Sequence, residues 1–383
     1  MGETPTDAPD RPDEPALERV HAFDGRQLVV PPEGWDVEVP PFGDERFRGL
    51  SHRMQYWALR AAQSSVLGLP RVLREGLVRL VAAAGRTFDR RHTRAAEDYI
   101  RTALPGASDA EVAELVREAW RHLLRVALVA EGVEKRVMGG RFGEHYDCYA
   151  CPEALEVLDS DAGAFLVTAH VGYWEASCPA LIGMGCTPGY AIGKAPRNDF
   201  VAREIQRVRE AQGLRLIPRN GAMNAVPAAV RSGGSVGILL DHRPRQKPVI
   251  APFFGRPAAC DRSAGVLIRR VRAPLVFYGC YGAPGTDPVR DWRFEMRVPA
   301  VIQPEELAGV SPEEIVARVN AELERLILHR PSEVFWLHDR FRDAPESFPD
   351  DGGSDDLASE SAKSGGPDET VGGTLSAETP PSA

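Results

Sequence analysis

The residue with the clearest chemical potential is a histidine at the end of an apolar run. In FLVTAHVGYWEAS, a strand-like segment over 164–169 leads directly to His170, and Glu175 follows five positions later. Strand ends are where α/β folds place reacting groups. A carboxylate in the first turns of a following helix can orient one imidazole nitrogen and leave the other as a general base. The pattern predicts this role for His170 and Glu175, although such a pair is also common as a structural contact.

Basic and polar residues follow two other strand-like runs, SVGILL and the run over 189–192. These residues are Asp241, His242, Arg243, Arg245, Lys194, Arg197 and Asn198. Cations gathered at the carboxyl edge of one sheet suit a phosphate group, and a loop that opens a helix adds backbone donors. Surface arginines are also often merely solvated. The segments therefore predict a substrate-binding edge next to His170.

Nothing in the sequence demands a metal or a redox group. The six cysteines are spaced irregularly, which predicts reduced thiols and no disulfide framework. His145, Cys148 and Cys151 could supply half of a zinc site, but no second ligand pair follows, so ordinary cysteines are the better interpretation. We expect no metal, no bound cofactor and no nucleic-acid partner.

Short apolar runs separated by turns and helical patterns begin after residue 133, which is typical of an α/β sheet. The predicted strands are Ala164–Ala169, Gly189–Ile192, Leu214–Ile217, Ser235–Leu240, Pro274–Tyr281 and Trp292–Val298. The predicted helices between and after them are Asp199–Gln212, Ala222–Ser232, Asp261–Val271 and Pro312–His329.

Two helical regions precede this core. From Met54 to Arg91 leucines alternate with arginines at helical spacing, interrupted at Pro70. Such a segment can lie in a lipid headgroup region or pack on the core with a solvated basic face. A second helix is predicted from Ser108 to Glu131, because Ser108 and Glu111 have the spacing of a capping box.

Charge divides the chain into three parts. Residues 1–45 and 343–383 each carry a net charge of −9, which leaves about +9 on the body between them. The ends are rich in Pro, Gly, Ser and acids, so we expect disordered tails at 1–45 and 346–383 around a domain at 46–345, with amphipathic helices over 54–132 and a catalytic core over 133–345. A basic body suits an anionic membrane, a phosphate or an acidic carrier protein.

Location can be anticipated from what the sequence lacks. No run approaches the roughly 20 apolar residues of a spanning helix, and the acidic start has no signal-peptide pattern. We therefore expect a peripheral protein on the cytoplasmic face of the plasma membrane.

Three blocks in order resemble the bacterial lipid A biosynthesis acyltransferases. HVGYWE resembles the H-x4-D/E motif, LLDHRPRQKPVIAPFFGRPAA the strand with an Asp and its PFFG-type loop, and EVFWLHDRFRDAP the closing segment that contains Arg340. The resemblance implies a glycerol-phosphate-acyltransferase-like mixed sheet flanked by helices. It also implies a His170–Glu175 dyad and an acyl thioester donor on acyl carrier protein or coenzyme A. Substrate contacts are expected from Lys194, Arg197, Asn198, Asp241, Arg243 and Arg340.

The expected reaction moves a fatty acyl group to a hydroxyl of a glycolipid, phospholipid or lipid A-like acceptor. Backbone amides of the Pro252–Gly255 turn or Arg243 are candidates to stabilise the oxyanion. Tyr173, Trp174 and the two phenylalanines of that turn are candidates for an acyl groove. The alternatives are a thioesterase or lipid esterase that uses the same dyad, and a non-catalytic lipid-binding protein.

Overall fold

The structure, a computed structural model, describes residues 17–30, 35–160, 162–244 and 248–348. Its centre is a mixed sheet of 8 strands in the order β1-β2-β10-β9-β3-β6-β4-β5. The strands are β1 (Glu18–Arg19), β2 (Tyr146–Ala150), β3 (Phe165–Thr168), β4 (Gly189–Gly193), β5 (Leu214–Pro218), β6 (Ser235–Leu239), β9 (Leu275–Gly282) and β10 (Phe294–Ile302). A separate hairpin joins β7 (Pro248–Phe253) to β8 (Arg256–Asp261).

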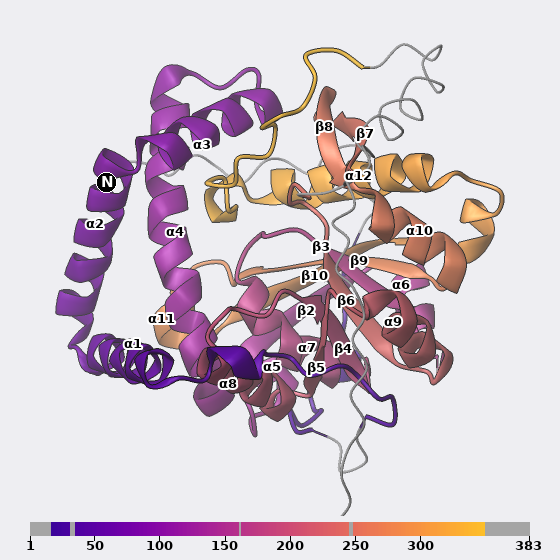
Figure 1. Ribbon diagram of the computed structural model, residues 1–383, viewed down its shortest axis with the longest axis horizontal. Helices are drawn as coiled ribbons and strands as arrows, with labels where there is room; N and C mark the ends of the chain where they lie inside the picture. The colour runs from indigo at the N-terminus through magenta and orange to yellow at the C-terminus, as the bar shows by residue number, and fades with distance from the viewer. Residues whose placement is uncertain (1–16, 31–34, 161, 245–247, 349–383) are drawn as a thin grey trace, which may run out of the picture. The chain divides into compact units, whose positions relative to one another are not determined.

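The helices surround this sheet (Figure 1). They are α1 (Leu50–Gly68), α2 (Arg71–Phe88), α3 (Arg90–Ala103), α4 (Asp109–Arg136), α5 (Phe142–His145), α6 (Pro152–Leu158), α7 (Ser177–Gly183), α8 (Asp199–Ala211), α9 (Ala222–Arg231), α10 (Arg262–Val271), α11 (Pro288–Asp291) and α12 (Pro312–His329). Short 3₁₀ turns cover His21–Phe23, Glu45–Phe47, Trp174–Ala176, Pro304–Leu307 and Pro331–Glu333.

The central strands are apolar on both faces because helices cover both faces. In β3, Phe165 and Val167 belong to the core cluster formed with α9, α10 and α12. Leu166 points to the opposite cluster, which is formed with α4, α6 and α7. This alternation is the period of two that a strand imposes on its side chains. All six predicted strands and the α/β class are confirmed.

The helix signals of the sequence are also confirmed. Pro70 separates α1 from α2, and Ser108 and Glu111 form the predicted capping box at the start of α4. Three pairings escaped prediction: β1–β2, β2–β10 and the β7–β8 hairpin. The hairpin turns at Phe254 and Gly255, both with positive φ (50° and 71°), as a tight two-residue turn requires.

The prediction of a disordered tail over 1–45 is wrong for the part that the structure describes. Val20, Phe23 and Leu28 are buried in the cluster that also holds α4 and β2. Leu28 exchanges backbone hydrogen bonds with Gly139 and Gly140, at 2.8 and 2.9 Å. Counting charges over the whole segment obscured these few apolar residues. The remaining tail residues, 1–16, 31–34 and 349–383, lie outside the described part of the chain.

Leu28 provides a test of this correction. Its side chain is fully buried, so Leu28→Ala should lower the free energy of unfolding by about 2–5 kcal/mol through lost transfer energy and a new cavity. Val29→Ala is the matched control, because Val29 is 53% exposed and should change stability by less than about 0.5 kcal/mol. Denaturant unfolding curves of both variants measure this difference. Equal free energies of unfolding for Leu28→Ala and Val29→Ala would indicate that the folded domain begins near residue 46.

Candidate active site

The register of two parallel strands brings His170 and Asp241 together. β3 and β6 pair with Phe165 opposite Val236 and Thr168 opposite Leu239, an offset that continues to His170 and Asp241 two residues beyond the strands. Asp241 Oδ1 lies 2.7 Å from His170 Nδ1, and its Oδ2 accepts a hydrogen bond of 2.8 Å from the His170 backbone amide. One carboxylate thus holds both the ring and the backbone of the histidine.

The electrostatics of this pair fix its protonation. Burial alone would raise the pKa of Asp241, but the charge and hydrogen bonds of His170 reverse this and hold that pKa well below its usual range. An ionised carboxylate only accepts hydrogen bonds, so His170 Nδ1 carries a proton and Nε2 is left with its lone pair. Burial also opposes a charged His170, yet Asp241 outweighs burial and raises the pKa of the ring above 6.5.

Glu175 does not take the predicted place beside the His170 ring. Its Oε1 accepts a hydrogen bond of 3.0 Å from Trp174 Nε1, and its Oε2 pairs with Arg209 of α8. In the described chain no hydrogen bond joins Glu175 to His170, although the carboxylate is near enough to favour the charged ring. The prediction that Glu175 orients His170 is therefore wrong. Residues 174–176 form a 3₁₀ turn, and the Glu175 carboxylate forms an ion pair with Arg209.

The turn that carries His170 is fixed from several sides. Phe335 donates a backbone hydrogen bond of 3.0 Å to the His170 carbonyl. His122 of α4 donates from Nε2 to the Gly172 carbonyl at 2.8 Å; burial lowers the pKa of His122 to about 4, so its ring is neutral. Gly172 has φ +56°, and a Cβ there would lie 2.1 Å from the Cys280 carbonyl oxygen, so only glycine fits. His122 was not predicted from the sequence, because no motif surrounds it.

The substrate-binding residues proposed from the sequence divide into two groups. Lys194 and Arg197 are exposed at the carboxyl end of β4, as expected. Arg243 pairs with Asp343 at 2.7 Å, and its backbone amide faces His338 Nε2 at 3.3 Å. Lys194 and Arg197 are therefore exposed near the end of β4, whereas the Arg243 side chain is paired with Asp343. Arg245 lies outside the described residues.

Asn198 and Arg340 are occupied by structural contacts. Asn198 caps α8 through its side-chain oxygen, and its amide nitrogen donates to the His52 carbonyl of α1 at 2.7 Å. Arg340 is 1% exposed and donates to the Ala259 carbonyl at 2.8 Å. These contacts give both residues a structural role, and their predicted contact with a substrate stays a prediction. Asp241 likewise has an observed partner, since its carboxylate contacts the ring and the backbone amide of His170.

Some of the residues predicted for the acyl groove and the oxyanion lie near His170, and others do not. Trp174 lies against the His170 ring with centroids 5.2 Å apart, and Phe335 lies 5.9 Å away on another side. Tyr173 and Phe253 are buried in the core. The Phe254 amide donates to Glu324 at 2.6 Å and is not free for an oxyanion. Trp174, predicted as part of an acyl groove, lies beside the His170 ring, and so does Phe335, which was not predicted from the sequence.

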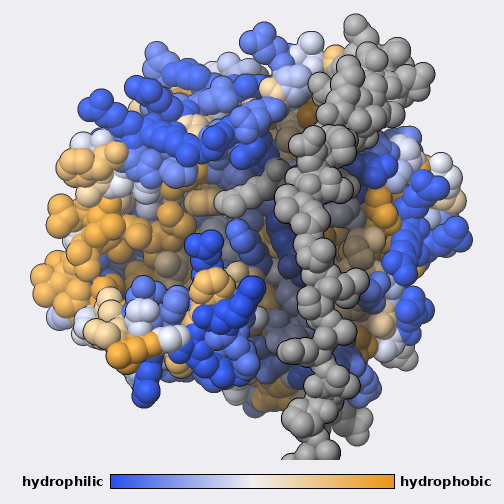
Figure 2. All heavy atoms as spheres, viewed as in Figure 1, coloured by the Kyte–Doolittle hydropathy of each residue, from blue (hydrophilic) through white to orange (hydrophobic). Residues whose placement is uncertain are grey.

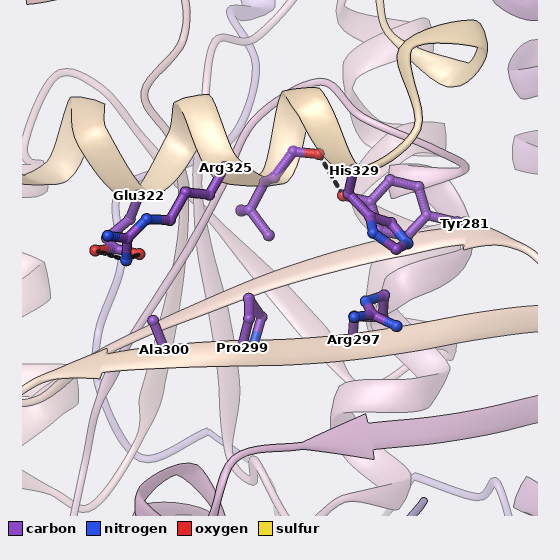
Figure 3. Close-up of a pocket in the computed structure, with 8 residues that line it drawn as sticks. Tyr281, Arg297, Pro299, Ala300, Glu322, Arg325 and His329 are labelled. Carbon is purple, nitrogen blue, oxygen red and sulfur yellow. Dashed lines mark hydrogen bonds and ion pairs between the residues drawn. The ribbon is translucent and has the colours of Figure 1, made fainter. Parts of the chain in front are cut away.

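A small cleft beside α12 does not belong to this site. Figure 3 shows it between α12 and the sheet, with Glu322 and Arg325 paired at 3.0 Å. Tyr281 on its other side donates to the Leu326 carbonyl at 2.6 Å. None of its lining residues takes part in the contacts of His170 or Asp241 given above. The cleft is a packing feature next to paired charges.

The described residues contain no group of three or more His, Cys, Asp or Glu side chains arranged to hold a metal ion. His145 instead faces the Trp292 carbonyl at 3.0 Å, and Cys148 and Cys151 are buried free thiols. Burial raises the pKa of the Cys148 thiol to about 12, which makes it a poor ligand or nucleophile.

A histidine at a strand end, held by a buried carboxylate, is an arrangement that can serve as a general base. A family model of the bacterial lipid A biosynthesis acyltransferases matches residues 43–343. The chain belongs to this family and is an acyltransferase. No protein of curated function matches it.

The geometry predicts that replacing Asp241 changes the pH dependence of kcat/KM more than replacing Glu175 does. The raised pKa of His170 places the acid limb of kcat/KM at a higher pH than an ordinary histidine would give, because catalysis needs the neutral ring. Asp241→Asn should shift that limb to lower pH and reduce the maximal rate about 10²–10⁴-fold. Glu175→Gln should shift it less and cost less, since its partners are Trp174 and Arg209. A larger effect at Glu175 than at Asp241, measured by pH-rate profiles, would contradict the observed pairing.

Proposed function

We propose that the protein transfers a fatty acyl group from a thioester donor, acyl carrier protein or coenzyme A, to a hydroxyl of a glycolipid acceptor. The observation that carries this proposal is the His170–Asp241 pair at the strand end, with Nε2 left as a base. Family membership supports the acyl chemistry and a lipid acceptor in general. The donor, the acceptor and the role of each residue are the proposal.

The reaction follows from the tautomer. His170 Nε2 removes the proton of the acceptor hydroxyl while the oxygen attacks the thioester carbonyl carbon. The C–S bond then breaks, and the leaving thiolate takes the proton from the imidazolium, which Asp241 stabilises. The products are an ester and a free thiol, with no metal or redox step. General-base catalysis contributes on the order of 10²–10⁴-fold, so positioning of the two substrates supplies much of the rest.

His170→Ala tests this mechanism. Turnover should fall by at least about 10²-fold, because the base is lost, and the melting temperature should fall too, because the buried Asp241 carboxylate loses its partner. The assay measures both esterified acceptor and free fatty acid, so that a thioesterase reveals itself by releasing acid when acceptor is present. Wild-type turnover by folded His170→Ala protein would contradict the proposed role of His170 as general base.

Attachment to a membrane surface is the second part of the proposal. Apolar side chains gather over α1 and α2 in Figure 2. The large exposed ones on these helices are Leu50, Met54, Trp57, Leu59, Val72, Leu73, Leu80, Val81 and Phe88, between 43% and 85% exposed. An apolar groove of about 260 Å³ runs beneath them between α1, α2 and α4. Such a continuous apolar surface is typical of a site that contacts a membrane or partner.

The arginines of α1 and α2 contribute less to the proposed membrane attachment than the sequence indicated. Arg60 pairs with Glu131 at 2.6 Å, and Arg71 lies 3.7 Å from Asp287, which leaves Arg74 and Arg79 without a carboxylate partner among the described residues. In the described part of the chain, no helix is long and apolar enough to cross a bilayer. These observations support an interfacial mode driven mainly by apolar contact. We place the protein at the cytoplasmic face of the plasma membrane, as part of the same proposal.

Replacing two exposed leucines tests this mode. Leu73→Ser with Leu80→Ser should weaken binding to phosphatidylglycerol vesicles roughly tenfold or more, because each removes a side chain worth up to about 1.5–3 kcal/mol when buried. Ile205→Ser on α8 is the control, with 37% exposure outside the surface. Vesicle sedimentation at low and high salt separates the apolar from the electrostatic part. Unchanged binding by the double variant would exclude this surface.

A further inference from the structure

An arginine without a motif around it lies behind the turn that carries His170. Arg209 of α8 forms an ion pair with Glu175, and the two side chains are only 17% and 24% exposed. The second terminal nitrogen of Arg209 donates to Cys178 Sγ at 3.3 Å. A largely buried ion pair adds little net stability, because both charges lose their hydration. What the pair contributes therefore depends on the groups that it holds in place.

The Glu175 carboxylate connects Arg209 to an aromatic ring. Its Oε2 pairs with Arg209, and its Oε1 accepts a hydrogen bond of 3.0 Å from Trp174 Nε1. An indole has a single N–H donor and no acceptor, so this hydrogen bond fixes the direction in which the ring is turned. Because Arg209 holds one oxygen of the carboxylate, the other stays directed at the indole.

The Trp174 indole in turn packs on the His170 ring. Their centroids lie 5.2 Å apart with the ring planes at 79°, an edge-to-face contact. Phe335 contacts both rings, with centroid distances of 5.9 Å to His170 and 6.2 Å to Trp174. Asp241 holds one edge of the imidazole at Nδ1, and the aromatic contacts restrict the tilt of the rest of the ring. The direction of Nε2 therefore depends on Trp174 as well as on Asp241.

We propose that Arg209 is a positioning residue for the base. Through Glu175 it fixes the Trp174 indole, and the indole holds the His170 ring in the orientation in which Nε2 meets the acceptor hydroxyl. The inference rests on the proposed role of His170 as general base and adds a residue that contacts no reacting atom. It also gives Glu175 a target other than the imidazole: its carboxylate acts on the indole N–H.

A double-mutant cycle in the full-length protein tests this chain of contacts, with acyl-coenzyme A and vesicles of phosphatidylinositol as substrates. Arg209→Gln should lower kcat roughly ten- to hundred-fold and leave the KM of both substrates near wild type, because only the aim of the base changes. In Trp174→Phe protein, which has no indole N–H to hold, the same change should lower kcat less than about twofold. Equal losses in both backgrounds would overturn the proposal.

Two further variants control for the fold. Arg207→Gln is the matched control, because Arg207 lies on the same helix, is 53% exposed and pairs with Glu134 and Glu204 instead; its kcat should equal that of wild type. If Arg209→Gln does not fold, Arg209→Gln with Glu175→Gln takes its place in the cycle, since this pair of changes leaves no largely buried charge without its partner. The same comparison with and without the indole then decides.

NMR of the free protein separates this inference from the proposed function. Arg209→Gln should move the indole N–H resonance of Trp174 and the ring resonances of His170, whereas Arg207→Gln should move neither. In Trp174→Phe protein, Arg209→Gln should leave the His170 resonances in place. If wild-type protein transfers no acyl group, the proposed function fails, while these resonances still show whether Arg209 positions the ring. Unmoved His170 resonances in folded Arg209→Gln protein would overturn the positioning role.

Discussion

The candidate active site depends on the register between β3 and β6. Because residues pair across these strands with a constant offset, the two positions beyond their ends, 170 and 241, meet without any long loop. Asp241 then binds both the ring and the backbone amide of His170. A change of one residue in this register would turn the carboxylate to the other face of the sheet and leave a buried charge without its partner. The same register between β3 and β6 therefore sets both the packing of the two strands in the core and the contact between His170 and Asp241.

The sequence predicted the class of fold well because the central strands have strong local signals. Runs such as AFLVTA and SVGILL are apolar at every position, as strands buried on both faces must be. β2 was missed because YDCYA contains an acid and two tyrosines, and only its alternate residues are buried. β1, a strand of 2 residues, has no local pattern at all. Its place follows from the long-range contact with β2, which a single sequence does not encode locally.

The site was harder to predict than the fold. His170 was identified from its strand end, but the sequence placed its carboxylate five residues away on the assumption of a helical reach-back. The chain forms a 3₁₀ turn there, and Arg209 from α8 meets Glu175. The true partner was already among the candidates, as Asp241 at another strand end. Only the offset between β3 and β6, which needs both strand boundaries at once, distinguishes an orienting group from a substrate-binding one.

Helix α4 connects the reacting turn to the apolar surface. His122 donates to the Gly172 carbonyl, while Leu124, two residues further along, lines the groove shared with α1 and α2. Two residues turn a helix by about 200°, so these contacts lie on opposite faces of one rigid element. If the surface of α1 and α2 rests in a bilayer, the depth of His170 relative to the lipid headgroups is set by the width of a helix rather than by a linker. The base then meets lipid hydroxyls at a constant height above the acyl chains.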